Sequence, residues 1–290
     1  MVTIRVAHSP DSDDAFMFHG IACGAVRAEG IVFEQALVDI ESANEAAREG
    51  RHDVTALSAA AYPLVADRYL LLDSGASFGD GYGPVVVVPE GSPARTLDEL
   101  AGGRIAIPGA RTSAALALLL RLPRHEPVVM EFRAVGAAAR RGEVDAAVVI
   151  HEGQLTAPAE GLRVVEDLGA SWKARTRLPL PLGLNAVRRD LPGPVRAAVA
   201  RAWRESIEHG LAHRSEALDY AMGFARGLDR AKADAFVGMY VNEWTRALGP
   251  KGREAVVTFL GAAFDRGLLP RVKLEYQEAG LDDRRHTAQG

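Results

Sequence analysis

The chain has 290 residues, of which 48% are hydrophobic and 25% are charged, and its formal net charge is −4 at pH 7. This balance is ordinary for a globular protein, whereas an intrinsically disordered chain carries fewer apolar residues and more net charge. The slight acidity provides no basic surface for nucleic acid, so we expect no nucleic-acid partner.

The first 84 residues alternate short apolar runs with helical patterns. Repeated strand, capped loop and helix are typical of a parallel sheet. Segment 74–84 contains four glycines and is predicted to be a flexible crossing segment. The predicted strands are Ile4–His8, Ile31–Val38 and Val54–Leu57, with helical segments after residue 12, around Ala43–Arg48 and over Ala59–Val65.

A second series of strands and helices begins at Val85, and the chain becomes helical after Pro192. We predict an α/β fold with one lobe formed by residues 1–84 and 185–290, a second lobe formed by residues 85–184, and a ligand between them. The predicted strands of this series are Val85–Val88, Arg104–Ile107, Val128–Phe132, Ala146–Ile150, Leu162–Asp167 and Leu182–Val187. The predicted helices are Leu97–Leu100, Thr112–Leu120, Val135–Arg141, Leu168–Arg175, Ser215–Phe224, Arg230–Tyr240 and Gly252–Gly267, with a further one around residues 195–211.

Three features bear on the location of the chain. Cys23 is the single cysteine, so no internal disulfide can form. The first ten residues read as a strand and lack the basic start and apolar stretch of a signal peptide. No apolar run reaches the roughly 18 residues of a membrane span. We therefore expect a cytoplasmic protein without membrane contact.

Polar residues follow several predicted strands, where ligands collect in parallel sheets. The hydroxyls and first-turn amides of such loops can bind an oxyanion, and an arginine can add a charge-assisted contact. The alternative is that Ser12, Asp13, Ser58 or Thr112 only caps the next helix and that Arg111 is solvated. The candidate binding residues are Ser9 in the first loop, Thr55, Ala56, Leu57 and Ser58 after the third strand, and Arg111, Thr112 and Ser113 in the second lobe.

His151 follows the apolar run Val148–Ile150, at the carboxyl end of a predicted strand. A neutral imidazole there can accept a proton near neutral pH, and a structural histidine is the alternative. Glu152 is a candidate to orient it, although adjacent side chains on a strand point in opposite directions.

The sequence contains no P-loop, no G-x-S-x-G, no H-E-x-x-H and no paired-cysteine zinc pattern. We therefore expect neither a nucleotide cofactor nor a metal. The acids of residues 11–14 could serve a hydroxyl-rich ligand or a metal, but their spacing alone does not show convergent geometry.

Several motifs in order resemble a known family: SPDSDDAFMFHG, VDIE followed by Asn44, TALS, GYGPVVV, GARTSA, VVIHE and DLGASWKARTRLPLPLG. The chain is similar to the periplasmic-binding-protein-like enzymes of the futalosine route to menaquinone, and among them to the 1,4-dihydroxy-6-naphthoate synthase family, from the first strand to about Gly267. The resemblance implies a two-lobed, type II periplasmic-binding-protein-like fold. It also implies a cofactor-free carbon–carbon lyase that converts cyclic dehypoxanthinylfutalosine, a small anionic substrate, to 1,4-dihydroxy-6-naphthoate and dihydroxyacetone.

The resemblance further implies roles for individual residues. His151 matches the proton acceptor of the family, Thr55, Ala56 and Leu57 match its substrate-contacting stretch, and Thr112 and Ser113 match its hydroxyl pair. The family's first loop often reads SPCPND followed by threonine, whereas this chain has Ser9-Pro10-Asp11-Ser12-Asp13-Asp14-Ala15. Arg177 replaces a glycine of the family pattern.

The altered first loop leaves the substrate open. One alternative is the chorismate dehydratase of the same pathway, which shares the fold. Another is a non-catalytic solute-binding protein for a small anion. Nothing in the sequence indicates an oligomeric state.

Overall fold

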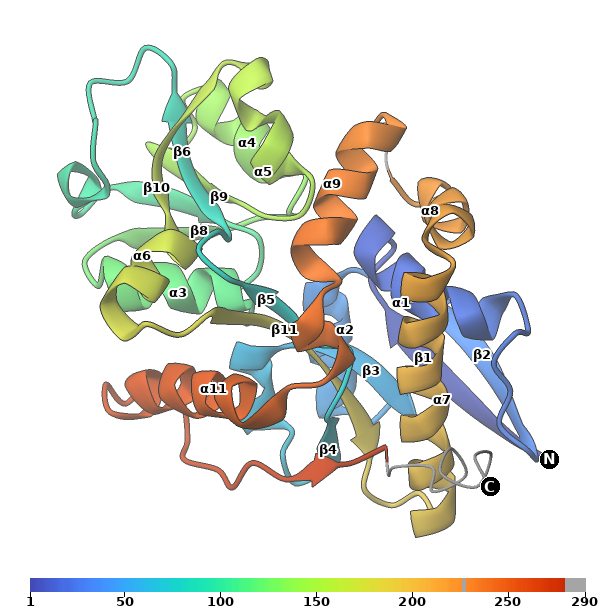
Figure 1. The fold of residues 1–290 in the computed structure, drawn as a ribbon. Helices are drawn as coiled ribbons and strands as arrows, with labels where there is room; N and C mark the ends of the chain where they lie inside the picture. Colours follow the sequence, from blue (N-terminus) through green and yellow to red (C-terminus); the bar gives the residue numbers. More distant parts are fainter. Residues whose placement is uncertain (226–227, 280–290) are drawn as a thin grey trace.

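Two separate β-sheets organise the chain, and helices cover both of them (Figure 1). The structure is a computed structural model, and it describes residues 1–225 and 228–279. The larger sheet has seven strands in the order β12-β4-β11-β3-β1-β2, with β5 paired to β11. These strands are β1 (Val2–His8), β2 (Ile31–Leu37), β3 (Val54–Ser58), β4 (Tyr69–Leu72), β5 (Ser77–Gly79), β11 (Leu180–Arg188) and β12 (Tyr276–Gln277).

Strand directions in the larger sheet are mixed. β1 runs parallel to β2 and β3, as predicted, but β11 runs antiparallel to β3, β4 and β5. The prediction of a parallel sheet is wrong for β11 because this strand brings the chain back from the second sheet and enters the first one from the opposite end. The glycine-rich segment 74–84 contains the short strand β5 and is therefore more than a flexible crossing.

The smaller sheet has five strands in the order β10-β6-β9-β7-β8. β7 runs parallel to β8 and β9, whereas β6 runs antiparallel to β9 and β10. Val85–Val88 is buried, as expected for a wholly apolar central strand. The strands are β6 (Val85–Pro89), β7 (Arg104–Ile107), β8 (Glu126–Val129), β9 (Ala146–Val149) and β10 (Leu162–Asp167).

The helices begin and end within a few residues of most predicted limits. A proline inside the segment after β3 is compatible with its 3-10 form, because the ring removes a backbone donor. The α-helices are α1 (Ser12–Ala22), α2 (Ile40–Arg48), α3 (Ser113–Arg121), α4 (Ala134–Arg140), α5 (Gly153–Thr156), α6 (Leu168–Thr176), α7 (Gly193–Ala212), α8 (Arg214–Met222), α9 (Arg230–Tyr240), α10 (Glu243–Arg246) and α11 (Gly249–Phe264). The 3-10 helices are η1 (Ala59–Leu64), η2 (Leu97–Leu100) and η3 (Ala157–Glu160).

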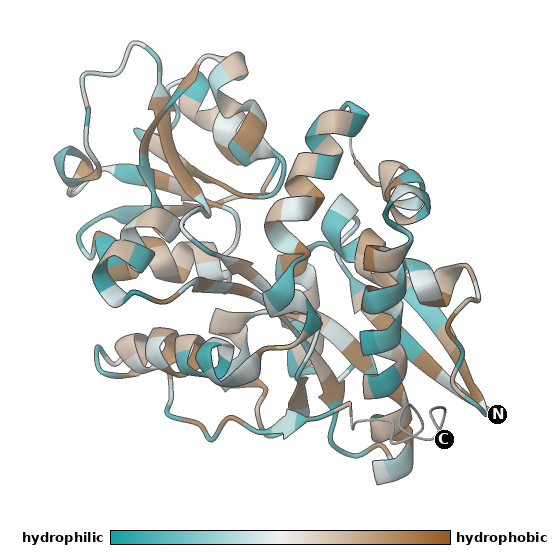
Figure 2. Ribbon diagram, in the orientation of Figure 1, coloured by the Kyte–Doolittle hydropathy of each residue, from teal (hydrophilic) through white to brown (hydrophobic). Residues whose placement is uncertain are grey.

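Hydrophobic residues concentrate along the strands of both sheets, while α7 shows a hydrophilic outer face (Figure 2). One cluster of buried apolar side chains joins the sheets, since it contains Leu57 and Leu184 of the larger sheet and Val86 and Ile105 of the smaller one. The lobes therefore share part of their core. Among the described residues, no helix is long and apolar enough to span a membrane.

Helices from the C-terminal part of the chain complete the larger lobe. α7 packs along α1, and α9 lies between the lobes (Figure 1). The hydroxyl of Tyr240, at the end of α9, donates a hydrogen bond to Oε1 of Gln154 on α5, at 2.8 Å. The architecture is the two-lobed α/β fold that the resemblance implied, and the lobe boundaries at residues 84 and 184 stay a prediction.

Candidate active site

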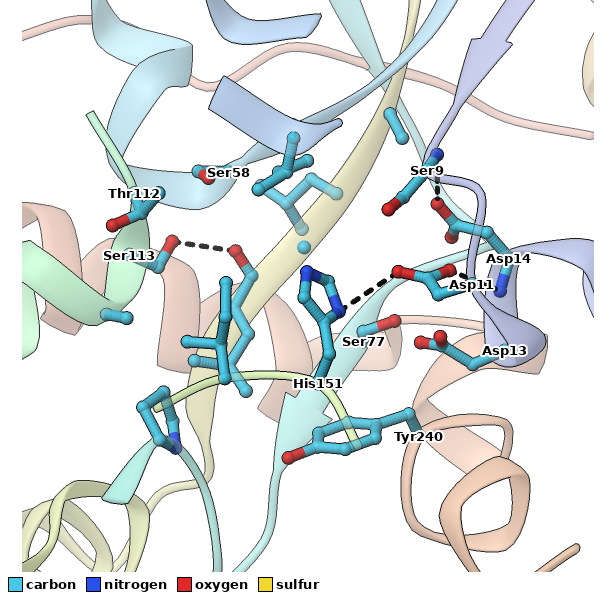
Figure 3. A pocket seen from close by; sticks show the side chains of 18 of the residues that line it. Ser9, Asp11, Asp13, Asp14, Ser58, Ser77, Thr112, Ser113, His151 and Tyr240 are labelled. Carbon is cyan, nitrogen blue, oxygen red and sulfur yellow. Dashed lines mark hydrogen bonds and ion pairs between the residues drawn. The ribbon is translucent and has the colours of Figure 1, made fainter. Parts of the chain in front are cut away.

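A pocket lies where loops of the two sheets meet (Figure 3). It holds about 690 Å³ of space between atoms, part of it open to solvent. Its walls come from the loop after β1, the end of β3, the start of α3, the loop after β9, strand β11 and helix α9. Six of the residues predicted from the sequence line it together: Ser9, Ala56, Ser58, Thr112, Ser113 and His151.

His151 projects into this pocket and meets a carboxylate from the other lobe (Figure 3). Its Nδ1 lies 3.0 Å from Oδ2 of Asp11, a residue that is only 2% exposed. The ring of Phe132 packs edge-on against the imidazole, with 5.1 Å between ring centroids. Two neighbours from separate segments therefore fix the orientation of the imidazole.

The backbone of His151 is unusual as well. Its φ is 53°, in the left-handed region that a residue with a Cβ rarely occupies. Such strain costs on the order of 1–3 kcal/mol, and it persists only where surrounding contacts enforce it. The contacts with Asp11 and Phe132 provide that enforcement.

Three carboxyl groups of the first loop share one small region. Oxygen atoms of Asp11, Asp13 and Asp14 lie within 4.8 Å of one another. Burial and the nearby Asp11 carboxylate raise the pKa of Asp14 to about 8 and raise the pKa of Asp13 well above its usual value. Burial alone would raise the pKa of Asp11 too, but the electrostatic interaction and hydrogen bond with His151 hold that pKa below its usual range. Near neutral pH the negative charge therefore concentrates on Asp11, beside the imidazole.

These three oxygens are hard ligands of the kind that Mg²⁺ and Ca²⁺ prefer. Such sites rely on ionised carboxylates, whereas two of these three favour the protonated form in the absence of an ion. Oδ1 of Asp13 is buried with no hydrogen-bond partner among the described residues, but because Asp13 favours the protonated form this oxygen carries little charge to attract an ion. The cluster is more simply a brace for the loop.

The hydrogen bonds of the first loop explain its shape. Oδ2 of Asp14 accepts a bond from the backbone N–H of Ser9 at 2.8 Å. The side chain of Asp11 caps α1 by accepting from the N–H of Asp14, which corrects the expectation that Ser12 or Asp13 is the cap. Glu152, the acid that the sequence suggested for orienting His151, accepts from Oγ of Ser12 at 3.5 Å.

Strand alternation separates the predicted residues of β3. Ala56 and Ser58 line the pocket, while Thr55 and Leu57, both fully buried, are not among its lining residues. The reason is that alternate residues of a strand face opposite sides. The hydroxyl of Thr55 donates to the carbonyl of Ala56 at 2.8 Å instead. The pocket therefore gives no support to Thr55 and Leu57 as side-chain contacts of a substrate.

Arg111 also points elsewhere. Its guanidinium pairs with Glu45 and lies 3.8 Å from Oε1 of Glu41, both on α2 of the larger lobe. Its backbone N–H donates to the Glu41 carboxylate at 3.2 Å. Arg111 is thus a partly exposed ion-pair partner and not a wall of the pocket; it joins the loop before α3 to α2.

The hydroxyl groups at the start of α3 are already bonded. Thr112 caps the helix by accepting from the N–H of Ala115 at 3.1 Å. Oγ of Ser113 donates to the carbonyl of Leu182 at 2.7 Å and accepts from the N–H of Ala60 at 3.2 Å. The first-turn N–H groups of Ser113 and Ala114 have no intrahelical acceptor, which is the usual condition of an anion-binding helix terminus.

Ser58 is fixed from behind by Asn44, which is fully buried. The side-chain oxygen of Asn44 accepts from the N–H of Ser58 at 2.8 Å, and its amide nitrogen donates to Oγ of Ser58 at 3.1 Å. Ser58 therefore enters the pocket wall with its hydroxyl held in one orientation and does not cap η1 through its side chain.

Sequence reasoning missed several residues of the pocket. Asp11 is the most consequential, and its signal was present: an aspartate replaces the cysteine of the family pattern in a loop that follows the first strand. Ser77 and Asn185 could not be found in this way, because a glycine-rich segment and a returning strand carry them into the pocket.

Comparisons with known proteins agree on one family. A family model described as "Menaquinone biosynthesis" matches residues 4–265. The 1,4-dihydroxy-6-naphtoate synthase of Thermus thermophilus is 40% identical over 268 residues, which cover 92% of this chain and 96% of the relative. The enzyme of the same name from Streptomyces coelicolor is 35% identical over 274 residues, which cover 92% of this chain and 95% of the relative.

Solved structures give the same fold. Protein AF1704 from Archaeoglobus fulgidus is 44% identical with a TM-score of 0.86, and the match covers 92% of this chain and 98% of that one. The alkanesulfonate-binding protein SsuA from Xanthomonas axonopodis pv. citri is 17% identical with a TM-score of 0.73, covering 96% of this chain and 99% of that one. The second likeness concerns the fold alone, which is that of periplasmic binding proteins.

Proposed function

The chain belongs to the menaquinone biosynthesis family, and from that premise we propose that it acts as a 1,4-dihydroxy-6-naphthoate synthase. Its relatives are named as synthases, so the chain is an enzyme. We propose that it is a carbon–carbon lyase that needs no cofactor, that it converts cyclic dehypoxanthinylfutalosine to 1,4-dihydroxy-6-naphthoate and dihydroxyacetone, and that it works in the cytoplasm. The observation that carries the proposal is the Asp11–His151 contact inside the pocket between the lobes.

The proposed reaction requires removal of a proton from carbon beside a carbonyl group. This step needs a positioned base and a means of stabilising negative charge on oxygen. His151 is suited to be the base, because its ring enters the pocket while Asp11 holds Nδ1. When the ring takes the proton through Nε2, the Asp11 carboxylate stabilises the imidazolium that forms.

The opposite wall supplies the second requirement. The first-turn amides of α3 reach the pocket together with Thr112 and Ser113. Ser58 adds a hydroxyl whose orientation Asn44 fixes. Donors held in place before the substrate arrives need no reorganisation as charge develops, which is the main benefit of such a site. A carboxylate or an enolate oxygen of the substrate is the expected acceptor.

Contacts between the lobes would close the site around the substrate. Tyr240 bonds to Gln154, and Arg111 pairs with acids of α2. Closing a pocket in this way excludes water from a reactive intermediate. Entry of the substrate then requires these contacts to open and re-form in each turnover.

Incubation of the purified chain with cyclic dehypoxanthinylfutalosine tests the proposal directly. We expect 1,4-dihydroxy-6-naphthoate and dihydroxyacetone in equal amounts, detected by liquid chromatography and mass spectrometry. The variant His151→Gln should lose turnover by roughly 100-fold or more, because a general base contributes about 10²–10⁴. It should still bind the substrate. His125→Gln, outside the pocket, is the matched control and should retain activity.

A parallel incubation with chorismate covers the alternative dehydratase. Formation of 3-[(1-carboxyvinyl)oxy]benzoate with no naphthoate product would replace the present proposal. A solute-binding protein would be favoured if well-folded protein bound a ligand and returned it unchanged after long incubation. In that case His151→Gln should bind the ligand as the parent does.

A further inference from the structure

A second cluster of reactive side chains lies at the far end of α1, away from the pocket. His19 lies on α1, Cys23 follows its last residue, and His209 lies on α7, which packs along α1. One nitrogen or sulfur atom from each of the three lies within 4.8 Å of the others. Sγ of Cys23 is 4.0 Å from Nε2 of His209.

The helices determine this meeting. Residues four apart share one face of a helix, so His19 and Cys23 point toward the same neighbour. His209 approaches from that neighbour, and its ring lies nearly parallel to the ring of His19, with 5.6 Å between centroids. His213, the residue directly after α7, stacks on His209 with 4.2 Å between ring centroids.

The buried member of the cluster, His19, has a ring nitrogen without a hydrogen-bond partner among the described residues. His19 is only 6% exposed, and the nitrogen in question is its Nδ1. A buried polar atom without a partner is uncommon and calls for an explanation, such as an ion. Cys23 is exposed, so a solute can reach the cluster from outside.

We propose that His19, Cys23 and His209 form a binding site for a borderline-soft divalent cation, of which Zn²⁺ is the best match. Two imidazoles and one thiolate are ligands that zinc prefers, whereas Mg²⁺ and Ca²⁺ require oxygen. Tetrahedral zinc with such ligands separates the donor atoms by about 3.5 Å, so side-chain rotations must draw the cluster together by roughly 1 Å. Water would fill the fourth position, or His213, whose ring stacks on that of His209.

The proposed site differs from the linear motifs sought in the sequence. Two of its ligands lie at α1 and the third lies on α7, almost 190 residues further along the chain. No motif of closely spaced residues could therefore predict the complete site. It also lies outside the proposed chemistry. α1 begins at Ser12, beside Asp11, and the seven residues from there to His19 span roughly 10 Å. A bound cation would clamp α1 to α7 and thereby stabilise the helix that carries the first loop of the pocket.

Cobalt is the probe for the test, because a thiolate bound to Co²⁺ produces a charge-transfer absorption that imidazole and water ligands do not. The full chain, free of any affinity tag and stripped of metal, is titrated with Co²⁺ under a non-chelating reductant. We expect saturation at one equivalent with the thiolate absorption, followed by its loss when Zn²⁺ displaces cobalt. Zn²⁺ should also raise the melting temperature, since a ligand that binds only the folded state stabilises it.

Variants separate a built site from surface binding. Cys23→Ser should abolish the thiolate absorption, and His209→Ala, at a half-buried position, should weaken Co²⁺ binding at least tenfold. His125→Ala in the other lobe is the matched control and should bind as the parent does. No saturable binding, or a thiolate absorption that survives Cys23→Ser, would overturn the proposal. Lyase activity plays no part in these readouts, so the result is independent of the proposed function.

Discussion

Oδ2 of Asp11 lies 3.0 Å from Nδ1 of His151, so a carboxylate on the loop after β1 holds an imidazole on the loop after β9. The two residues are 140 positions apart, and the loops that carry them follow strands of different sheets. Their contact therefore has two effects at once: it orients the candidate base and it ties the lobes together beside the pocket.

Replacing Asp11 tests the first effect. Asp11→Asn keeps the size of the side chain and removes the charge that stabilises the imidazolium. We expect kcat to fall roughly 10- to 100-fold, less than the loss of the base itself, because His151 remains in place and a general base contributes about 10²–10⁴. The acid limb of the kcat/KM profile should move to lower pH, because protonation of the ring loses its counter-ion. A purely structural role for Asp11 would lower activity without moving that limb.

Glu152→Gln provides the comparison for this variant. Glu152 follows His151 in sequence, yet its carboxylate accepts a hydrogen bond from Ser12 of the first loop at 3.5 Å. We expect this variant to change kcat less than Asp11→Asn does, with the pH limb in place. If Glu152→Gln produced the larger shift of the limb, Glu152 would be the residue that supports the base.

The acid cluster makes stability depend on pH. Asp14 has a pKa of about 8 in the folded chain, whereas an unfolded aspartate has a pKa of about 3.9. Between these values the folded state binds more protons than the unfolded state, so this contribution to stability is complete below about pH 4 and is lost as pH rises to about 8. The slope approaches about 1.4 kcal/mol per pH unit for one proton.

Asp14→Asn should remove this dependence. Asparagine cannot ionise, and its side-chain oxygen can still accept the bond from the N–H of Ser9. Urea unfolding at several pH values between 5 and 8 should show a flatter profile for the variant, with its largest gain over the parent at pH 8. Equal slopes in the two proteins would mean that Asp14 is ionised in the folded state at neutral pH.

Much of the fold was predictable because strands and helices are encoded locally. The limits predicted for β7 and β10 coincide with the observed ones, since each is a short run bounded by turn residues. β5 was missed because glycine and serine give no apolar alternation, and its pairing with β11 forms the strand instead. The direction of β11 could not be predicted from the sequence either, because it depends on where the returning chain enters the sheet.

The candidate site was also predictable in part: the sequence indicated positions along the chain but not the contacts between them. Positions such as His151 and Ser58 are recognisable because each lies at the end of an apolar strand. What each side chain contacts is tertiary information, and so Asp11 was missed as the partner of His151 while Arg111 was placed in the pocket although it pairs with α2. Local patterns locate polar residues along the chain, and the convergence of the lobes decides which of them meet.

Ser113 is expected to support both stability and binding. Its hydroxyl joins the start of α3 to the carbonyl of Leu182 and the N–H of Ala60. Ser113→Ala leaves both backbone groups without this partner, which costs about 1–3 kcal/mol for each group that stays buried. We expect a lower urea midpoint and a raised KM. Ser171→Ala, on α6 away from the pocket, is the control and should leave KM unchanged.

Two glycines with positive φ provide the last test, because their surroundings differ. Gly109 precedes the start of α3 with φ at 136°, and a Cβ there would lie 2.7 Å from the carboxyl carbon of Glu41. Gly102 has φ at 81°, with nothing within 4 Å of a Cβ. Both alanine variants place a Cβ at positive φ, which costs on the order of 1–3 kcal/mol, and the φ of Gly109 lies further from the left-handed helical region than that of Gly102. Only Gly109→Ala must also displace Glu41.

Displacing Glu41 removes the acceptor of the Arg111 N–H and disturbs the partner of Asn44, which fixes Ser58. We therefore expect Gly109→Ala to be the less stable variant in urea unfolding and to raise KM several-fold, while Gly102→Ala keeps the KM of the parent. Equal losses of stability with unchanged KM in both variants would show that the contact between α2 and the loop before α3 does not support the pocket wall.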